Sequence, residues 1–309
     1  MIRSPLFAAA IALVMAAPAH AYFEETAAGA RGVALGSAAL GVIDDASAYY
    51  WNPAALSGIK RYEVIADFAK PYGIPDLNVG TLAVAGRHFG TGWAVAWHRL
   101  AIGGSYSEDL FHLAAGRRVL ETPNGHVLSA GATYKLGRIS FAPFDNPDSG
   151  AEVDLGSQAK GSADLALKWV TPWRLDFSWV GRNLVEPTYQ FVEGTGGDAA
   201  ERRQEVAAAL RWNRESVATV GWSQQELGPA TFNAGIEILF YDVFSIRSGV
   251  SNLSEIYKAY GSPNDLQYNG GFGVFHKGYF VDVAATTNHD LGASYRVTLR
   301  LPFGSEARP

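Results

Sequence analysis

SYRVTLRLPF, residues 294 to 303, alternates between apolar and polar side chains over most of its length. The apolar set is Tyr295, Val297, Leu299, Leu301 and Phe303, and the positions between them hold Ser294, Arg296, Thr298 and Arg300. This period of two is that of a β-strand with one apolar face. A slip of one residue would make two arginines face the lipid, which costs about 2 to 4 kcal/mol of folding free energy for each near the bilayer midplane. The stretch therefore predicts a strand whose register is firmly fixed.

The same alternation recurs upstream in residues 163–169, 175–182, 205–212 and 244–250. The charges on their polar faces are Asp164, Lys168, Asp176, Arg182, Glu205, Arg211 and Arg247. A soluble sandwich would also alternate, but several segments end on an aromatic residue, as the girdles of membrane barrels do. These aromatics are Trp93, Trp169, Trp173, Trp212, Trp222, Tyr241 and Tyr279. The pattern predicts an all-β protein, a transmembrane antiparallel β-barrel with its charges turned to the lumen.

Turn signals divide residues 60–303 into about fourteen strands, with twelve as the alternative. The predicted strands start near Arg61, Asp76, Thr91, Tyr106, Gly125, Gly161, Trp173, Ala200, Ser216, Pro229, Val243, Asp265, Gly278 and Leu291. Tight connections alternate with long ones, as periplasmic turns alternate with extracellular loops. The longest loops are predicted at residues 140–160, 184–201 and 252–261, and residues 304–309 form a C-terminal tail.

Composition and motifs exclude several other classes of protein. A formal net charge of -5 does not provide the positively charged surface that nucleic-acid binding requires. The chain has no cysteine, and its histidines lack metal-site spacing, so neither a metal nor a cofactor is expected. No nucleophile elbow or phosphate loop is found, so an enzyme is not expected. His98 and His112 would be the first residues to test for a dispersed active site, and a polar lumen network is the simpler interpretation.

The first 21 residues have the features of an export signal. Arg3 precedes an apolar run from Leu6 to Ala17, and Ala19-His20-Ala21 fits a cleavage site. The run is shorter than the about 18 to 20 residues that span a bilayer. We expect cleavage after Ala21 and location in the outer membrane of a Gram-negative bacterium.

Residues 22–59, between this leader and the first strand, are expected to form a hatch inside the barrel. Their central part, GARGVALGSAALGVIDDASAYYWNPAAL at residues 29–56, is rich in glycine and alanine, which permit close packing against a wall. A fourteen-stranded barrel leaves a lumen that such a segment could plug. Pro53 disfavours helix at Asn52, whose side chain can bond the nearby backbone, so a rigid turn is expected there.

The glycine-alanine run, the acid pair Asp44-Asp45 and the tripeptide Asn52-Pro53-Ala54 resemble the hatch of FadL/TodX-type outer-membrane transporters, including their compact PorV/PorQ-like branch. The last strand, ending on Phe303, resembles the signal that the barrel-assembly machinery reads. The resemblance implies contact with outer-membrane lipid and passive uptake of hydrophobic small molecules, fatty-acid-like or aromatic. It also implies an alternative: a scaffold whose extracellular loops hold an exported protein.

The candidate site combines the hatch with the lumen charges that would face it. Its hatch residues are Asp44, Asp45, Tyr49, Tyr50, Trp51, Asn52, Pro53 and Ala54, and its lumen network is Arg247, Asp282, Arg296 and Arg300. The two acids could form a gate by pairing with lumen arginines such as Arg247, Arg296 or Arg300, or could cap a short helix over residues 46–51. The three aromatics could form a ledge for an apolar ligand or could pack the plug against the wall.

Overall fold

The computed structural model describes residues 22–23, 27–146, 150–192, 197–213, 216–226, 230–253, 266–288 and 291–304. The expected leader, residues 1–21, lies outside the described residues, as do residues 305–309 of the expected tail. In the described ranges, no helix is long and apolar enough to cross a membrane.

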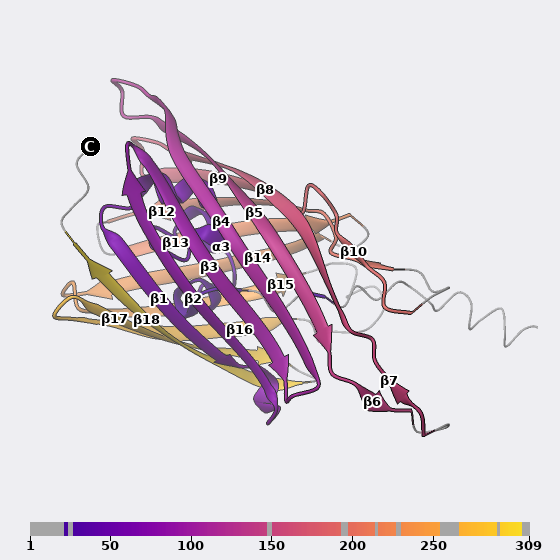
Figure 1. The fold of residues 1–309 in the computed structure, drawn as a ribbon. Helices are drawn as coiled ribbons and strands as arrows, with labels where there is room; N and C mark the ends of the chain where they lie inside the picture. The colour runs from indigo at the N-terminus through magenta and orange to yellow at the C-terminus, as the bar shows by residue number, and fades with distance from the viewer. Residues whose placement is uncertain are drawn as a thin grey trace, which may run out of the picture.

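Fourteen antiparallel strands close into a barrel (Figure 1). The strands are β1 (Tyr62–Lys70), β2 (Leu77–His88), β3 (Thr91–Ile102), β4 (Tyr106–Glu121), β5 (Val127–Phe141), β8 (Ser157–Val170), β9 (Leu175–Arg182), β12 (Arg203–Arg211), β13 (Ser216–Gln225), β14 (Ala230–Phe240), β15 (Phe244–Leu253), β16 (Gln267–His276), β17 (Tyr279–Asn288) and β18 (Gly292–Phe303). The barrel closes where β1 pairs with β18, from Tyr62 opposite Phe303 to Lys70 opposite Tyr295. The predicted fold class is confirmed, with fourteen strands rather than twelve.

The observed strand starts differ from the predicted ones by four residues at most. The largest difference is at β8, which begins at Ser157 instead of near Gly161. The sequence concealed this extension because Ser157 to Lys160 contains no large apolar residue to mark the alternation. Two short hairpins in the loops were also missed: β6 (Phe144–Asp145) with β7 (Glu152–Val153), and β10 (Thr188–Tyr189) with β11 (Asp198–Ala199).

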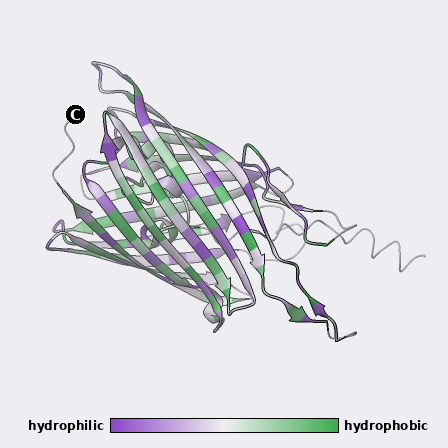
Figure 2. Cartoon of the chain, in the orientation of Figure 1, coloured by the Kyte–Doolittle hydropathy of each residue, from purple (hydrophilic) through white to green (hydrophobic). Residues whose placement is uncertain are grey.

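The outside of the barrel is apolar, and Figure 2 shows hydrophobic and hydrophilic residues alternating along the strands. On β18, Tyr295, Val297 and Leu299 are exposed on the outer face, whereas Arg296 and Arg300 are buried inside. Aromatic side chains gather at the tight-turn end, where Phe89 is 87% and Tyr241 91% exposed. This is the arrangement expected of a wall that faces acyl chains and ends in an aromatic girdle.

Two of the tight turns have the backbone that their hairpins require. Phe89 and Gly90 between β2 and β3 have φ of 47° and 76°, and Lys277 and Gly278 between β16 and β17 have φ of 50° and 89°. Two successive residues with positive φ match the twist of the strands that they join. The opposite end of the barrel carries the longer connections, so the two ends differ as predicted.

The hatch follows the inner wall around the lumen as four short helical segments. These are α2 (Ala30–Ala34), η1 (Ala39–Gly41), α3 (Ala48–Trp51) and η2 (Pro53–Gly58), and a further turn, η3 (Pro71–Gly73), follows β1. The first, α2, contacts β15 to β18, and η1 contacts β9, β12 and β13. The last two contact the wall around β2 to β5. Figure 1 shows these turns enclosed by the strands.

Candidate functional site

Inward-facing glycines of the wall receive the hatch backbone. Gly92 on β3 lies opposite Gly116 on β4, which lies opposite Gly131 on β5. A Cβ atom at Gly116 would lie 2.2 Å from the Pro53 carbonyl oxygen, and one at Gly131 would lie 2.3 Å from the Ala54 nitrogen. Any larger residue would push the start of η2 off the wall. We call these three residues the glycine row.

A second seat lies on another part of the wall. Gly235 on β14 and Gly249 on β15 face each other in the ladder. A Cβ at Gly235 would lie 2.3 Å from the Leu35 carbonyl oxygen, and one at Gly249 would lie 2.3 Å from the Gly36 nitrogen. The hatch is therefore held by backbone contacts at two separate places. Sequence analysis missed both seats, although glycines on the lumen parity of adjacent strands were the available signal.

Arg31 of α2 is the main charge that links the hatch to the wall. Its guanidinium donates to both carboxylate oxygens of Glu237 on β14, at 2.8 and 2.9 Å, and to Asp44 at 2.6 Å. It also lies 3.6 Å from Asp45. Sequence analysis passed over this residue, yet it is the single charge between Ala27 and Ile43. A lone arginine in a glycine-alanine run was the signal, because a charge can be buried there only if it is paired.

Of the three arginines predicted to meet the acid pair, only Arg300 does so in the structure, with its Nη1 3.3 Å from Oδ2 of Asp45. The other two alternatives, Arg247 and Arg296, pair with carboxylates of the wall instead. Arg247 lies opposite Glu237 in the ladder and binds it at 2.5 Å, because a carboxylate of the neighbouring strand is closer than the hatch. Arg296 likewise binds Asp67 of the adjacent strand β1.

Asp282 on β17 connects the predicted lumen network. Its two oxygens accept from Arg247 at 2.6 Å and from Arg300 at 3.2 Å. Since Arg300 also contacts Asp45, a chain of charges runs from the wall into the hatch. A buried network of this kind is stabilising only when every charge has a partner.

The two acids of the hatch differ in environment. Asp45 is buried and its Oδ1 accepts hydrogen bonds from the Ser47 nitrogen at 2.9 Å and hydroxyl at 2.5 Å. These two bonds form a turn that immediately precedes α3. The helix begins at Ala48 instead of the predicted residue 46. Asp44 is 61% exposed. Desolvation inside the barrel favours its neutral form, but the Arg31 guanidinium outweighs this and lowers the pKa of Asp44 below its ordinary value.

The three hatch aromatics have two different roles. Tyr49 is buried with its ring edge-on to His112, the centroids 4.9 Å apart. Trp51 is also buried, and its indole donates to the Ala28 carbonyl at 2.6 Å. Tyr50 is half-buried beneath the Arg182 guanidinium, which lies 4.7 Å from its ring centroid. Tyr49 and Trp51 therefore pack the plug, whereas Tyr50 lines a cavity.

The Asn52-Pro53 turn locks the end of α3 to the rest of the hatch. Asn52 is extended, with φ of -158° and ψ of 96°, and its Oδ1 accepts from the Ala54 nitrogen at 3.1 Å. Its amide donates to the Leu40 carbonyl at 3.2 Å. Pro53 then begins η2. This fully buried turn places Pro53 and Ala54 on the glycine row.

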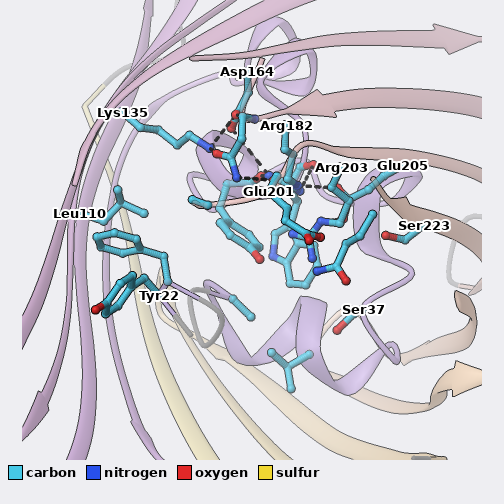
Figure 3. A pocket seen from close by; sticks show the side chains of 18 of the residues that line it. Tyr22, Ser37, Leu110, Lys135, Asp164, Arg182, Glu201, Arg203, Glu205 and Ser223 are labelled. Atoms are coloured by element: carbon cyan, nitrogen blue, oxygen red, sulfur yellow. Dashed lines mark hydrogen bonds and ion pairs between the residues drawn. The ribbon is translucent and has the colours of Figure 1, made fainter. Parts of the chain in front are cut away.

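A chamber of about 570 Å³ lies between the hatch and the long-loop end of the barrel (Figure 3). One side is charged: Lys135 pairs with Asp164 at 2.6 Å, and Glu205 accepts from Arg182 at 2.5 Å and lies 3.2 Å from Arg203. Tyr22, Phe23 and Tyr189 form an aromatic side of the lining, and Tyr50 and Trp51 line the chamber next to Arg182. The chamber can therefore contact both a flat apolar molecule and a polar substituent on it.

The start of the described chain contributes to the mouth of this chamber. The Tyr22 ring packs against Tyr189 and Phe191 of the loop between β9 and β12, with centroids 5.8 and 6.4 Å apart. The Phe23 nitrogen donates to Glu108 at 2.8 Å, and the Tyr189 hydroxyl donates to the Gly137 carbonyl at 3.0 Å. The aromatic side of the chamber is therefore built where the start of the described chain meets this loop.

The remaining candidates for chemistry are used in packing. His98 Nδ1 lies 2.9 Å from the Thr81 hydroxyl, and His112 lies under Tyr49. Across the residues that the structure describes, no group of three histidine, aspartate or glutamate side chains is placed to hold a metal ion.

No family model matches the chain, and no curated protein matches it in sequence. Solved structures match it in fold. A TodX monoaromatic hydrocarbon channel mutant (deltaS2) superposes with a TM-score of 0.60 at 10% identity, covering 90% of this chain and 98% of its own. The CymD monoaromatic hydrocarbon channel gives 0.54 at 10% identity, covering 87% and 97%. The outer membrane protein Omp33 of Acinetobacter baumannii gives 0.50 at 8% identity, covering 79% and 98%.

The fold is therefore that of an outer-membrane β-barrel, shared with hydrocarbon channels of the TodX type. The resemblance read from the sequence is confirmed at the level of the fold.

Proposed function

We propose that this protein is an outer-membrane channel for the passive passage of hydrophobic small molecules. The observation that carries the proposal is the chamber, which has an aromatic side and rests on a plug inside a barrel with the fold of TodX and CymD. Those two proteins are described as monoaromatic hydrocarbon channels. The aromatic side suits an aromatic ring, which gains by stacking or edge contacts beyond simple burial.

We infer that the hatch is the gate and that its ion pairs are what rearranges. Arg31 touches carboxylates on the wall, at Glu237, and on the hatch, at Asp44 and Asp45. A small shift of α2 would exchange one partner for another without leaving a buried charge unpaired, which is the costly outcome. A ligand that displaces Tyr50 from Arg182 would act on the same segment.

The alternative is a scaffold that holds an exported protein on its loops. The dense lumen charges were the argument for a closed support of that kind. They pair with one another along the wall, for example Arg182 with Glu205, and so leave the aromatic side of the chamber available to a ligand. The chamber and the likeness to hydrocarbon channels favour transport.

Uptake of a labelled monoaromatic compound by cells carrying the barrel tests this proposal. Ser223→Trp would narrow the chamber, because Ser223 on β13 lines it (Figure 3), and should reduce uptake. Gln224→Trp, which adds the same ring on the outer face of β13, is the matched control. Uptake unaffected by loss of the barrel, together with one stoichiometric exported protein that co-purifies with it, would favour the scaffold.

A further inference from the structure

The outer face of β3, β4 and β5 carries three rows of side chains in register. The first row is Trp97, Phe111 and Leu136; the second is Arg99, Asp109 and Arg138; the third is Ala101, Ser107 and Ser140. Ser157 of β8 extends the third row. Toward the long-loop end, the wall thus changes from apolar to charged to hydroxyl-bearing over two steps of the strand period. This sequence of surfaces matches the passage from acyl chains to headgroups.

The charged row is built to present its guanidinium groups. The Asp109 carboxylate accepts from the Trp97 indole at 2.9 Å and from Arg99 Nη1 at 3.1 and 3.2 Å. Its negative charge is therefore taken up within the row, while the Arg99 side chain stays 47% exposed. Arg138 is exposed beyond Asp109 and donates to the Ser157 hydroxyl at 3.3 Å.

A depression of about 250 Å³ adjoins this row at Arg99. Besides Arg99, it is lined by the turn Gly103-Gly104-Ser105, by Tyr106, Ser107 and Ser140, and by Phe141 and Ala142. The glycines leave room at the turn, and the hydroxyls can donate and accept hydrogen bonds. The depression therefore offers one guanidinium group, from Arg99, and several serine hydroxyl groups.

We propose that this face binds the phosphate-bearing headgroup of a phosphorylated glycolipid, the class of lipid that forms the outer leaflet of a Gram-negative outer membrane. Arg99 and Arg138 hold the phosphate, since a guanidinium matches its oxygens in planar, paired hydrogen bonds. The two arginines sit two strands apart, roughly 10 Å, so a headgroup with two phosphates can engage both. The serine row meets its sugar hydroxyls, and Trp97, Phe111 and Leu136 contact its acyl chains. The inference rests on the membrane location in the proposed function and is independent of what the chamber carries.

Lys70 provides a control at the same end of the barrel. It pairs with Tyr295 in the β1–β18 ladder, and its ammonium group already donates to the Pro75 carbonyl and, at 3.1 Å, to the Asn78 side chain. Its loss removes one positive charge from the rim without removing a guanidinium from the proposed site.

The test is to titrate the purified barrel in detergent with bisphosphorylated lipid A and to count bound lipid by native mass spectrometry. Heat-modifiable migration on gels verifies that each variant is folded. The Arg99→Gln/Arg138→Gln double variant should bind at least about tenfold more weakly, as expected for loss of two charge-assisted contacts. Lys70→Gln should stay within about twofold of the wild type. Wild-type protein should bind dephosphorylated lipid A as weakly as the double variant binds the intact lipid.

Equal lipid A binding by the wild type and the double variant would overturn the proposal, and so would an equal loss in Lys70→Gln. Uptake through the chamber should be unchanged in the double variant. A barrel that retains phosphate-dependent binding but transports nothing would refute the proposed function while leaving this site intact.

Discussion

Arg31 in the hatch and Glu237 in β14 are joined by two hydrogen bonds, from Nε at 2.9 Å and from Nη2 at 2.8 Å. Their side chains are only 12% and 11% exposed. A bidentate pair of this kind fixes direction as well as distance. It is therefore the contact that orients α2 against the wall.

Arg31→Gln should loosen the plug. It leaves a buried carboxylate short of a partner, a change that costs about 3 to 5 kcal/mol in general. We expect the lower end of that range, because Glu237 keeps Arg247. Planar-bilayer conductance should rise and the melting temperature should fall. Glu237→Gln should also raise conductance and lower the melting temperature. The double variant should lose less stability than the sum of the two single losses. Strict additivity would show that the two residues do not act as a pair.

Gly116→Ala should displace the hatch through the wall alone. Its added methyl group would lie 2.2 Å from the Pro53 carbonyl oxygen, so η2 must move away, at about 1 to 3 kcal/mol for overpacking. Conductance should increase. Gly80→Ala is the control, because a Cβ there meets no atom closer than 3.9 Å. If both variants conduct like the wild type, the glycine row does not hold the plug.

Deletion of residues 22–56 should open the barrel completely. The hatch occupies the lumen beneath the chamber, and without residues 22–56 a fourteen-stranded cylinder is wide enough for water and ions. Ion conductance in planar bilayers should exceed that of Arg31→Gln. Equal conductance with and without the segment would rule out its role as a plug.

Acid should remove the contribution of Asp44 to plug closure. The Arg31 guanidinium lowers the pKa of this carboxyl in the folded protein below its ordinary value of 3.8. The pair is therefore fully formed above that ordinary value and is lost as the pH falls through the lower folded-state pKa. The difference in conductance between Asp44→Asn and the wild type should be complete at about pH 7 and should disappear well below about pH 4. A difference that does not change with pH would mean that Asp44 acts without its charge.

Leu299→Arg should destabilise the barrel far more than Phe303→Arg. Both residues are on the outer face of β18, but Leu299 lies near the middle of the strand and Phe303 at its end. Arginine on the lipid face costs about 2 to 4 kcal/mol at the midplane and about 0 to 1 kcal/mol near the interface. Urea unfolding in lipid vesicles measures the two values. Equal losses would argue against a bilayer around this face.

The barrel could be predicted from the sequence because lipid and lumen impose opposite demands on alternate residues. Leu299 and Arg300 can satisfy both demands in only one register, so strand and face followed from the pattern, whereas turn signals left fourteen or twelve strands open. The hatch contacts could not be predicted in the same way. Arg247 and Arg300 look alike in sequence, and only the ladder reveals that Glu237 lies beside the first and Asp45 near the second.

The role of Arg31 and the two glycine seats could not be predicted because they depend on contacts between distant parts of the chain. Small residues in the hatch indicate close packing but not the partner surface. The partners, such as Gly131 and Gly249, lie more than 70 residues away in the chain. Their alignment across neighbouring strands becomes visible only when the strand register is known.

The close seating of Pro53 and Ala54 on the glycine row also has a consequence for assembly. A backbone pressed this tightly to the wall cannot easily be threaded through the lumen once β1 has sealed against β18. We therefore expect the hatch to be in position before the barrel closes, so that the sheet forms around it.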